Sequence, residues 1–289
     1  MEAVASANAE TMEAWNGVLF DRFLQFRDII VGSLGGHGDA GLAAHPPQLG
    51  QRVLDIGCGF GDTTQRIAGL VGPEGHVLGV DVAERFIELA RQEAAQAGVP
   101  NVGFVTGDVQ SMTLEGPFDY AFSRFGTMFF ANPVAALRNV REALVPGGRL
   151  CMVVWRRKLD NDWMHRAEVT VERFVQEPEE HDEPTCGPGP FSMADADTTS
   201  QILVGAGFEE IELRRFDTPN LMGRDLEEAV ALVTALGPAG EVIRTAGDDA
   251  ERVRPQVEAA LREALADFAG PDGVYGPASS WIVSARAPA

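Results

Sequence analysis

The sequence predicts an α/β fold, namely a seven-stranded, doubly wound and mostly parallel sheet with helices on both faces and helical cap insertions. From about residue 50 to residue 155, apolar segments of strand length alternate with amphipathic helical segments. Continuous apolar strands are typical of parallel sheets, because helices cover both of their faces. The chain has 289 residues, of which 45% are hydrophobic, enough for one large domain with a sizeable core.

Five strands are expected in this region: RVLDIG, HVLGVD, VGFVTGD, FDYAFSRF and RLCMVVW. Between them, DTTQRIAGLVG, AERFIELARQEAAQAG and PVAALRNVREALVPGG have the apolar spacing of helices. Two later strands, EEIELRRFD and SSWIVSARA, complete the predicted seven. The segment GVYGP before the last strand is interpreted as a turn, because Gly and Pro interrupt regular structure.

The remaining segments predict a cover and two insertions. Residues 1–48 are expected to form an N-terminal helical cover, and residues 49–289 the main domain. Cap or lid insertions are expected at about 157–193 and 219–275. The first contains the acidic stretch QEPEEHDEPTCGPGPF, which is predicted to be a loop, and the second is predicted to contain two or three helices.

Charge and cysteine content exclude several classes of partner. The formal net charge is −20, which disfavours nucleic acid and anionic membrane surfaces as partners. No apolar run approaches the roughly 20 residues of a membrane span, and the acidic N-terminus does not resemble a signal peptide. The three cysteines, Cys58, Cys151 and Cys186, lie far apart, as in a reducing compartment. We therefore expect a cytoplasmic protein, and no Cys/His spacing predicts a metal site.

The segment VLDIGCGFGDTT places Gly57, Gly59 and Gly61 directly after the first predicted strand. Such a loop is either a plain tight turn or a place where the backbone closely approaches a ligand. The dinucleotide fingerprint G-x-G-x-x-G is not met, because Asp62 occupies the position of its third glycine. A negative charge there also opposes a pyrophosphate at the start of the helix.

Two acidic residues end the next two strands, at the edge where ligands bind in open α/β sheets. Asp81 ends the second strand, and a carboxylate there can accept hydrogen bonds from the hydroxyl groups of a ribose. Asp108 ends the third strand, where it can accept from an adenine amino group. Each acid alone could be an ordinary cap or turn residue. Together with the glycine loop they predict a site for a nucleoside without phosphates.

Five motifs in order resemble the class I S-adenosylmethionine-dependent methyltransferases: VLDIGCGFGDTT, VLGVDVAE, FVTGDVQ, FDYAFSRFGTMFF and LVPGGRLCMVVW. The segments SRFGTMFFANP and DGVYGPASSWIVSARA are similar to the small-molecule branch of ubiquinone/menaquinone-biosynthesis type. The resemblance implies S-adenosyl-L-methionine as cofactor. It also implies transfer of a methyl group to a small organic acceptor, at O, N or activated C, by in-line displacement.

The resemblance further implies which residues bind the cofactor. Asp81 would hold the ribose, Asp108 the adenine, and Arg124 would border the sulfonium and the acceptor. The full implied set is Asp55, Gly57, Cys58, Gly59, Asp81, Val82, Asp108, Val109, Ser123, Arg124 and Trp15. Trp15 belongs to it because an N-terminal segment closes over the cofactor in related enzymes.

Aromatic residues after the fourth and fifth strands suggest an acceptor pocket: Phe125, Phe129, Trp155 and Trp163. They suit a planar or apolar acceptor beside a sulfonium, although aromatic residues are also common in cores. His165 is a candidate for a catalytic base. A small-molecule acceptor is the expected partner, and a homodimer is compatible with the sequence. Two alternatives remain: a non-catalytic module that binds the cofactor, and a nicotinamide-dependent oxidoreductase, which the glycine spacing opposes.

Overall fold

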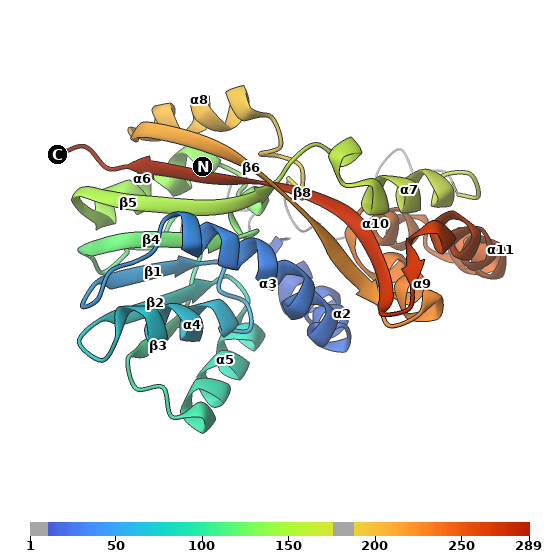
Figure 1. Ribbon diagram of the computed structural model, residues 1–289, viewed down its shortest axis with the longest axis horizontal. Helices are drawn as coiled ribbons and strands as arrows, with labels where there is room; N and C mark the ends of the chain where they lie inside the picture. The colour runs from blue at the N-terminus through green and yellow to red at the C-terminus, as the bar shows by residue number, and fades with distance from the viewer. Residues whose placement is uncertain (1–10, 176–187) are drawn as a thin grey trace.

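A computed structural model describes residues 11–175 and 188–289. Its centre is an open sheet with the strand order β3-β2-β1-β4-β5-β8-β6 (Figure 1). The strands are β1 (Arg52–Ile56), β2 (His76–Asp81), β3 (Val102–Thr106), β4 (Phe118–Arg124), β5 (Leu144–Trp155), β6 (Glu209–Gly223), β7 (Ala269–Gly270) and β8 (Gly273–Arg286). The first five are parallel and the β8 pairings are antiparallel, which confirms the predicted mostly parallel α/β sheet.

The topology reverses at β1, and this reversal positions the site. β1 pairs with β2 on one side and with β4 on the other, so the chain proceeds outward from β1 to β3 and then returns to the opposite side of β1 as β4. Side chains of β1 are buried on both faces, with Val53 and Leu54 at 0% exposure. Ligands of open α/β sheets bind beyond the carboxyl ends of the strands at such a switch point.

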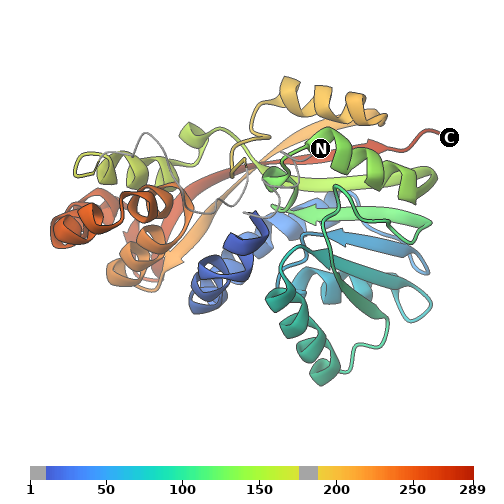
Figure 2. The same ribbon diagram turned by 180° about the vertical axis from the view of Figure 1, so that it is seen from behind.

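Helices cover both faces of the sheet. The helices α3 (Arg27–Ala44) and α4 (Asp62–Val71) lie against one face, and α6 (Pro133–Ala143) and α8 (Ala196–Ala206) against the other (Figures 1 and 2). α5 (Glu84–Ala97) follows β2. The start of α6 is set locally: the Asn132 side chain accepts a hydrogen bond from Ala135 N at 3.0 Å, and Pro133 fits the first helical position.

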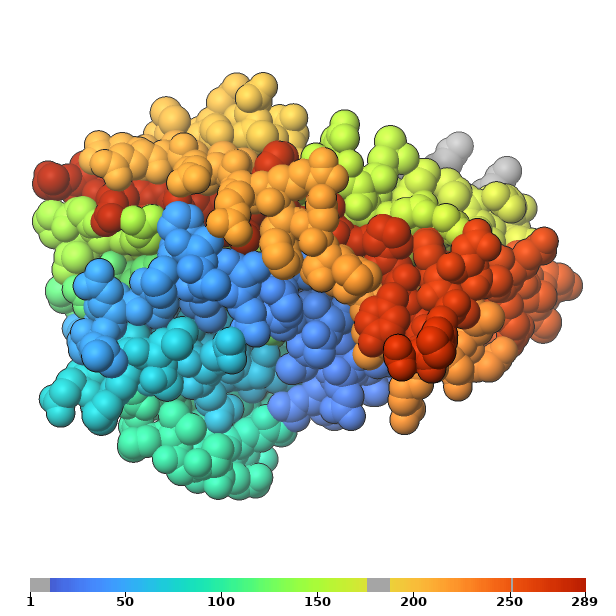
Figure 3. Space-filling view, in the orientation of Figure 1, coloured from blue at the N-terminus to red at the C-terminus, as the bar shows by residue number. Residues whose placement is uncertain are grey.

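The N-terminal helices lie between the sheet and the helical cap, as Figure 3 shows for the blue segment. Residues 11–16 are helical, and α2 (Val18–Gln25) and α3 follow. Glycines allow α3 to approach the sheet closely, because a Cβ atom at Gly41 would lie 3.0 Å from Val153 Cγ2. The predicted helical character of residues 1–48 therefore holds for the described residues 11–44.

The cap has a hydrophobic core of its own, which includes Val171, Val233 and Leu261. Its helices are α7 (Asp162–Val171), α9 (Leu226–Ala235), α10 (Gly237–Ala246) and α11 (Asp248–Leu265). Three short 3-10 helices complete the secondary structure: η1 (Thr127–Phe129), η2 (Lys158–Asp160) and η3 (Ala266–Phe268). No helix in the described part of the chain is long and apolar enough to cross a membrane.

Two expectations about the cap need correction. The segment GVYGP is not a turn, because it belongs to β8, and β6 continues to Gly223. The two strands therefore extend as a pair beyond the sheet and into the cap (Figure 1). Pro219 lies opposite Pro277, so the two residues that lack a backbone N–H face each other within the pair. Prolines and glycines thus gave a misleading turn signal here. The loop expected at 176–191 lies mostly outside the described residues.

We expect Gly276→Ala to destabilise the fold, because a Cβ atom there would lie 2.4 Å from Trp163 Cβ and 2.9 Å from Met222 Sδ. Overpacking of this kind costs about 1–3 kcal/mol. Gly270→Ala is the matched control, because its nearest neighbour would be Gly273 O at 3.7 Å. Urea unfolding of both variants gives the comparison. Equal losses in the two variants would contradict the close packing of α7 on β8.

Candidate active site

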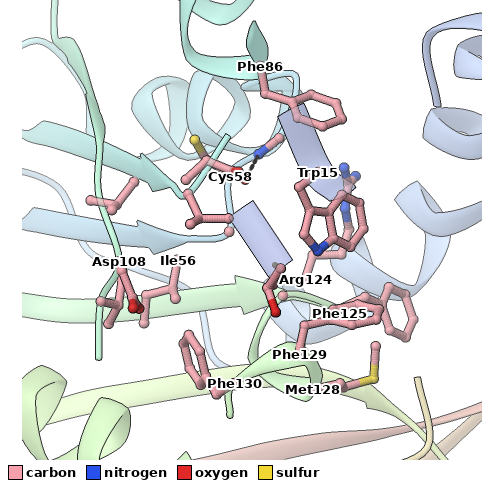
Figure 4. A pocket seen from close by; sticks show the side chains of 18 of the residues that line it. Trp15, Ile56, Cys58, Phe86, Asp108, Arg124, Phe125, Met128, Phe129 and Phe130 are labelled. Carbon is pink, nitrogen blue, oxygen red and sulfur yellow. Dashed lines mark hydrogen bonds between the residues drawn. The ribbon is translucent and has the colours of Figure 1, made fainter. Parts of the chain in front are cut away.

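A cavity of about 230 Å³ opens at the carboxyl ends of β1, β2 and β4. Its lining brings together most of the residues proposed from the sequence: Trp15, Gly57, Cys58, Gly59, Asp81, Val82, Asp108, Val109, Arg124, Phe125, Phe129 and Trp155. In Figure 4, Asp108 and Ile56 lie on one side of this space, and Trp15 and Phe125 lie opposite. We call this cavity the cleft.

The three glycines of the loop have different roles, although all have positive φ: +67° at Gly57, +51° at Gly59 and +76° at Gly61. A Cβ atom at Gly57 would lie 2.9 Å from Gly126 Cα, so this glycine lets two loops touch. A Cβ atom at Gly61 would meet Ala90 and Phe104 at 2.9 Å. Only Gly59 has no atom within 4 Å of its Cβ position, so it alone faces open space.

Asp81 joins the end of β2 to the glycine loop. Its Oδ2 accepts a hydrogen bond from Gly59 N and its Oδ1 accepts one from Ala83 N, both at 2.9 Å. Burial raises the pKa of Asp81, and these backbone hydrogen bonds oppose that increase. The Val82 backbone also donates to this carboxylate, whose two oxygens have four lone pairs in total. The carboxylate can therefore accept a further hydrogen bond from a ligand in the cleft.

Asp55 and Ser123 do not line the cleft. Asp55 is 1% exposed, and its Oδ2 accepts a hydrogen bond from Thr64 Oγ1 at 2.6 Å. Burial raises the pKa of Asp55 to about 7. Ser123 Oγ donates to Ile56 O at 2.9 Å, at the point where β1 enters the loop. Both side chains fix the loop from behind and do not contact the cavity.

Asp108 lines the cleft together with Gln110, which the sequence analysis did not single out. Asp108 Oδ1 accepts hydrogen bonds from Gln110 N at 2.9 Å and from Gln110 Nε2 at 3.1 Å. Gln110 Oε1 in turn accepts one from Asn132 N at 2.6 Å. These bonds orient Asp108 at the end of the cleft next to β3. The signal in the sequence was the motif GDVQ itself, in which the Gln follows the acid by two residues.

Aromatic rings from the N-terminal helices close one side of the cleft. Trp15 contacts Phe23 and Phe129 edge to face, with ring centroids 5.3 Å and 5.2 Å apart. Phe60 and Phe86 also line the cleft and contact each other at 4.9 Å. Neither was singled out from the sequence. Phe60 interrupts the glycines of the loop, and Phe86 lies five residues after Asp81, so both positions could have indicated the site.

Asp62 forms an ion pair with Arg124 across the loop. Arg124 Nη1 lies 2.7 Å from Asp62 Oδ2 and Nη2 lies 2.9 Å from Oδ1. The residue that departs from the dinucleotide fingerprint therefore has a structural partner. The pair places a carboxylate at the first residue of α4, where a pyrophosphate would bind in a dinucleotide site. This geometry opposes a nicotinamide dinucleotide in the cleft.

Phe125 and Trp155 form a stacked wall, with ring centroids 4.0 Å apart. The backbone of Phe125 has φ +59°, a strained value for an aromatic residue, and such strain is concentrated at functional sites. Behind the wall, the buried His37 contacts Trp155 at 5.1 Å and Phe125 at 5.5 Å. The His37 ring is held by Ser280 Oγ at 2.8 Å and by Asn220 Oδ1 at 3.0 Å.

Trp163 and His165 do not reach the cleft, although both were candidates from the sequence. Both lie on α7, where Trp163 packs between the sheet core and the cap core. Trp163 Nε1 and His165 Nδ1 are buried and have no hydrogen-bond partner among the described residues. The described lining of the cleft contains no histidine. Within residues 11–175 and 188–289, no group of three or more His, Cys, Asp or Glu side chains could hold a metal ion.

Residues 48–199, about half of the chain, match the sequence profile of the family described as "Methyltransferase domain". The chain belongs to this family. The match confirms the family predicted from the five motifs, the S-adenosylmethionine-dependent methyltransferases. The profile covers the glycine loop, Asp81, Asp108 and the Phe125–Trp155 wall, and it ends before β6 and most of the cap.

Curated relatives match part of the chain. A demethylmenaquinone methyltransferase of Listeria monocytogenes is 33% identical over 107 residues, which are 37% of this chain and 45% of the relative. The aklanonic acid methyltransferase DauC of a Streptomyces species is 36% identical over 105 residues, 36% of this chain and 48% of the relative. The chain thus spans about half the length of these relatives.

Solved structures show the same fold over most of the chain. The YcgJ protein of Bacillus subtilis has a TM-score of 0.58 at 17% identity and covers 88% of this chain and 99% of its own. Phosphoethanolamine N-methyltransferase 2 of Haemonchus contortus, solved with S-adenosyl-L-methionine, has a TM-score of 0.51 at 16% identity, over 88% of this chain and 53% of its own. At these identities the likeness concerns the fold alone.

We expect Gly57→Ala and Gly59→Ala to have different effects. Both place a side chain at positive φ, which costs about 1–2 kcal/mol of stability. Gly57→Ala should cost more, because of its contact with Gly126. Gly59→Ala should mainly weaken S-adenosylhomocysteine binding, because its methyl group enters the cleft. An overlap that costs about 1–3 kcal/mol lowers the affinity roughly 5- to 150-fold. Calorimetry and urea unfolding measure the two effects. Wild-type affinity in Gly59→Ala would contradict this assignment.

We expect His37 to make the protein less stable as the pH falls from 6.5 to 4. Burial lowers the pKa of His37 from 6.5 to about 4, so in this range the unfolded chain binds the proton and the folded protein does not. A shift of this size corresponds to about 3 kcal/mol at pH 4 and below. The measurement is urea unfolding of wild type and His37→Asn at several pH values. The stability difference between them should shrink as the pH falls; a constant difference would show that His37 keeps its ordinary pKa.

Proposed function

We propose that this chain transfers the methyl group of S-adenosyl-L-methionine to a small organic acceptor in the cleft. The observation that carries the proposal is the geometry of Asp81 and the glycine loop. The Asp81 carboxylate is fixed by two backbone N–H groups, keeps a free lone pair, and lies beside Gly59, the glycine that faces open space. This combination fits a ribose with two hydroxyl groups, and the Asp62–Arg124 pair at the start of α4 opposes a pyrophosphate.

The residues of the cleft fit the parts of the cofactor in order. Asp81 would accept hydrogen bonds from the ribose, and Asp108 with Gln110 would bind the adenine amino group. Gly57, Cys58 and Gly59 would border the methionine part, held in place from behind by Asp55 and Ser123. Trp15, Phe23 and Phe129 would cover the bound cofactor and exclude water.

The bound cofactor supplies a methyl group that its sulfonium has already activated. The contribution of this chain is to align an acceptor atom opposite the sulfur, and orientation of this kind provides a large part of catalysis. The Phe125–Trp155 wall and Phe129 would form the acceptor side. Flat aromatic surfaces favour a planar or apolar acceptor next to a positive sulfonium. The two curated relatives are both named for small organic molecules, demethylmenaquinone and aklanonic acid, which supports this class.

The deciding experiment uses S-adenosylmethionine with an isotope-labelled methyl group and a panel of quinones, phenols and amines. Mass spectrometry should find one labelled product together with S-adenosylhomocysteine. A non-catalytic module would bind both forms of the cofactor without any transfer. Tight binding of NAD without binding of S-adenosylmethionine would favour an oxidoreductase.

The proposal also includes a homodimer and a cytoplasmic location. The wide spacing of the three cysteines supports the cytoplasmic location.

We expect Phe129→Ala and Trp163→Ala to separate the acceptor side from the cap. Phe129 lines the cleft, so its loss should lower turnover roughly tenfold or more, through misplacement of the acceptor. Trp163 packs between two cores, so its loss should cost about 3–5 kcal/mol of stability. Turnover per folded molecule and the urea midpoint are the two measurements. If Trp163→Ala lost turnover while keeping full stability, Trp163 would belong to the acceptor site.

A further inference from the structure

A second cavity, of about 350 Å³, lies at the opposite edge of the sheet, where β1, β4 and β5 begin and β8 ends. It shares no lining residue with the cleft. The side chains that determine its chemistry are polar or charged: His45, Gln51, Asp119, Arg149 and Arg286. The proposed methyl transfer uses none of them. We call it the amino-edge cavity.

Two arginines face each other in this cavity. Arg149 of β5 and Arg286 of β8 are directly opposite in the antiparallel register, an arrangement in which like charges destabilise a sheet. Arg286 is compensated, because its Nε lies 3.2 Å from Glu210 Oε2 and its Nη1 donates to Gly147 O at 2.7 Å. Arg149 forms no ion pair in the described part of the chain. Arg149 therefore has no carboxylate partner there, although the protein carries a net charge of −20.

The polar partner of Arg149 is a histidine. Arg149 Nη1 lies 3.0 Å from His45 Nδ1, and the guanidinium can only donate, so the Nδ1 atom must accept. Burial lowers the pKa of His45, and the nearby Arg149 lowers it further, so the ring is neutral. It therefore does not balance the positive charge of Arg149. Its proton is then on Nε2, which is a second donor beside the guanidinium.

The other polar groups agree with an anionic ligand on the Arg149 side. Gln51 Oε1 accepts a hydrogen bond from Gln48 N at 2.7 Å, which leaves the Gln51 amide nitrogen as a donor. Asp119 is the one carboxylate of the described lining, and its Oδ2 accepts from Arg52 N at 2.8 Å. This bond holds the acid at the start of β1. Of the two arginines in the described lining, Arg286 has an ion-pair partner and Arg149 has none.

We propose that the amino-edge cavity binds a small molecule that carries a phosphate or carboxylate group, with Arg149 as the main cationic contact and His45 as an additional donor. The anion would offset the repulsion between the Arg149 and Arg286 guanidinium groups. It would also accept hydrogen bonds from N–H groups of Arg149. Charge-assisted bonds from a planar guanidinium are the strongest contacts that a protein offers to such groups. The site is independent of the cofactor cleft.

The test is titration of the protein with inorganic phosphate, followed by calorimetry and by thermal unfolding. Sodium chloride at equal ionic strength is the reference, and saturating S-adenosylhomocysteine fills the cleft. We expect saturable phosphate binding and a higher unfolding temperature than in chloride. Arg149→Gln should weaken phosphate binding roughly tenfold or more, because it removes charge-assisted hydrogen bonds to the anion. Arg149→Lys, which keeps the charge, should restore part of the affinity.

The matched control is Arg214→Gln. Arg214 is exposed on β6 and acts on the pKa of His45 through its charge, but it does not line the cavity. This control should keep nearly the full phosphate affinity. Equal effects of phosphate and chloride on wild type would overturn the proposal. Equal losses in Arg149→Gln and Arg214→Gln would also overturn it, because they would show a general effect of charge in place of a built site.

Discussion

The fold of the site depends on one interaction, the Asp81 carboxylate that joins the end of β2 to the glycine loop after β1. Its two hydrogen bonds fix Gly59 N and Ala83 N at the switch point of the sheet. Because β1 lies between β2 and β4, the position of this loop also sets the distance to Gly126 and Phe125. The rigid sheet thereby supplies the geometry, and the loops supply the chemistry.

The cleft combines two kinds of wall with different origins. The polar wall comes from the ends of β1 to β3 and belongs to the part of the chain that the family profile covers. The aromatic wall combines η1 and the ends of β4 and β5 with helices that precede the sheet in sequence. His37 connects the second wall to the strands that enter the cap, through Ser280 and Asn220. The aromatic wall of the cleft is therefore linked to the cap, while the polar wall is linked to the sheet.

The errors of the sequence interpretation have a common physical cause. The glycines and the proline of GVYGP indicated a turn, but this segment belongs to β8, which pairs with β6, and Pro277 faces Pro219. Trp163 follows a strand that ends at the cleft, but η2 and the first turn of α7 carry it onto Gly276. The sequence did not indicate the role of His37, because its hydrogen-bond partners are 183 and 243 residues away. In each case the decisive contact joins segments that are distant in sequence.

The sequence by itself determined the parallel sheet, the glycine loop, the two acids at strand ends and the family. These features depend on local chemistry: apolar periodicity, backbone freedom at glycine, and the common edge that parallel strands share. The tertiary structure alone decided which glycine faces the cleft, that Asp55 and Ser123 act from behind, and that Asp62 pairs with Arg124. It also brought Arg149 opposite Arg286. Such relations depend on the register and packing of distant segments, which no local pattern of residues encodes.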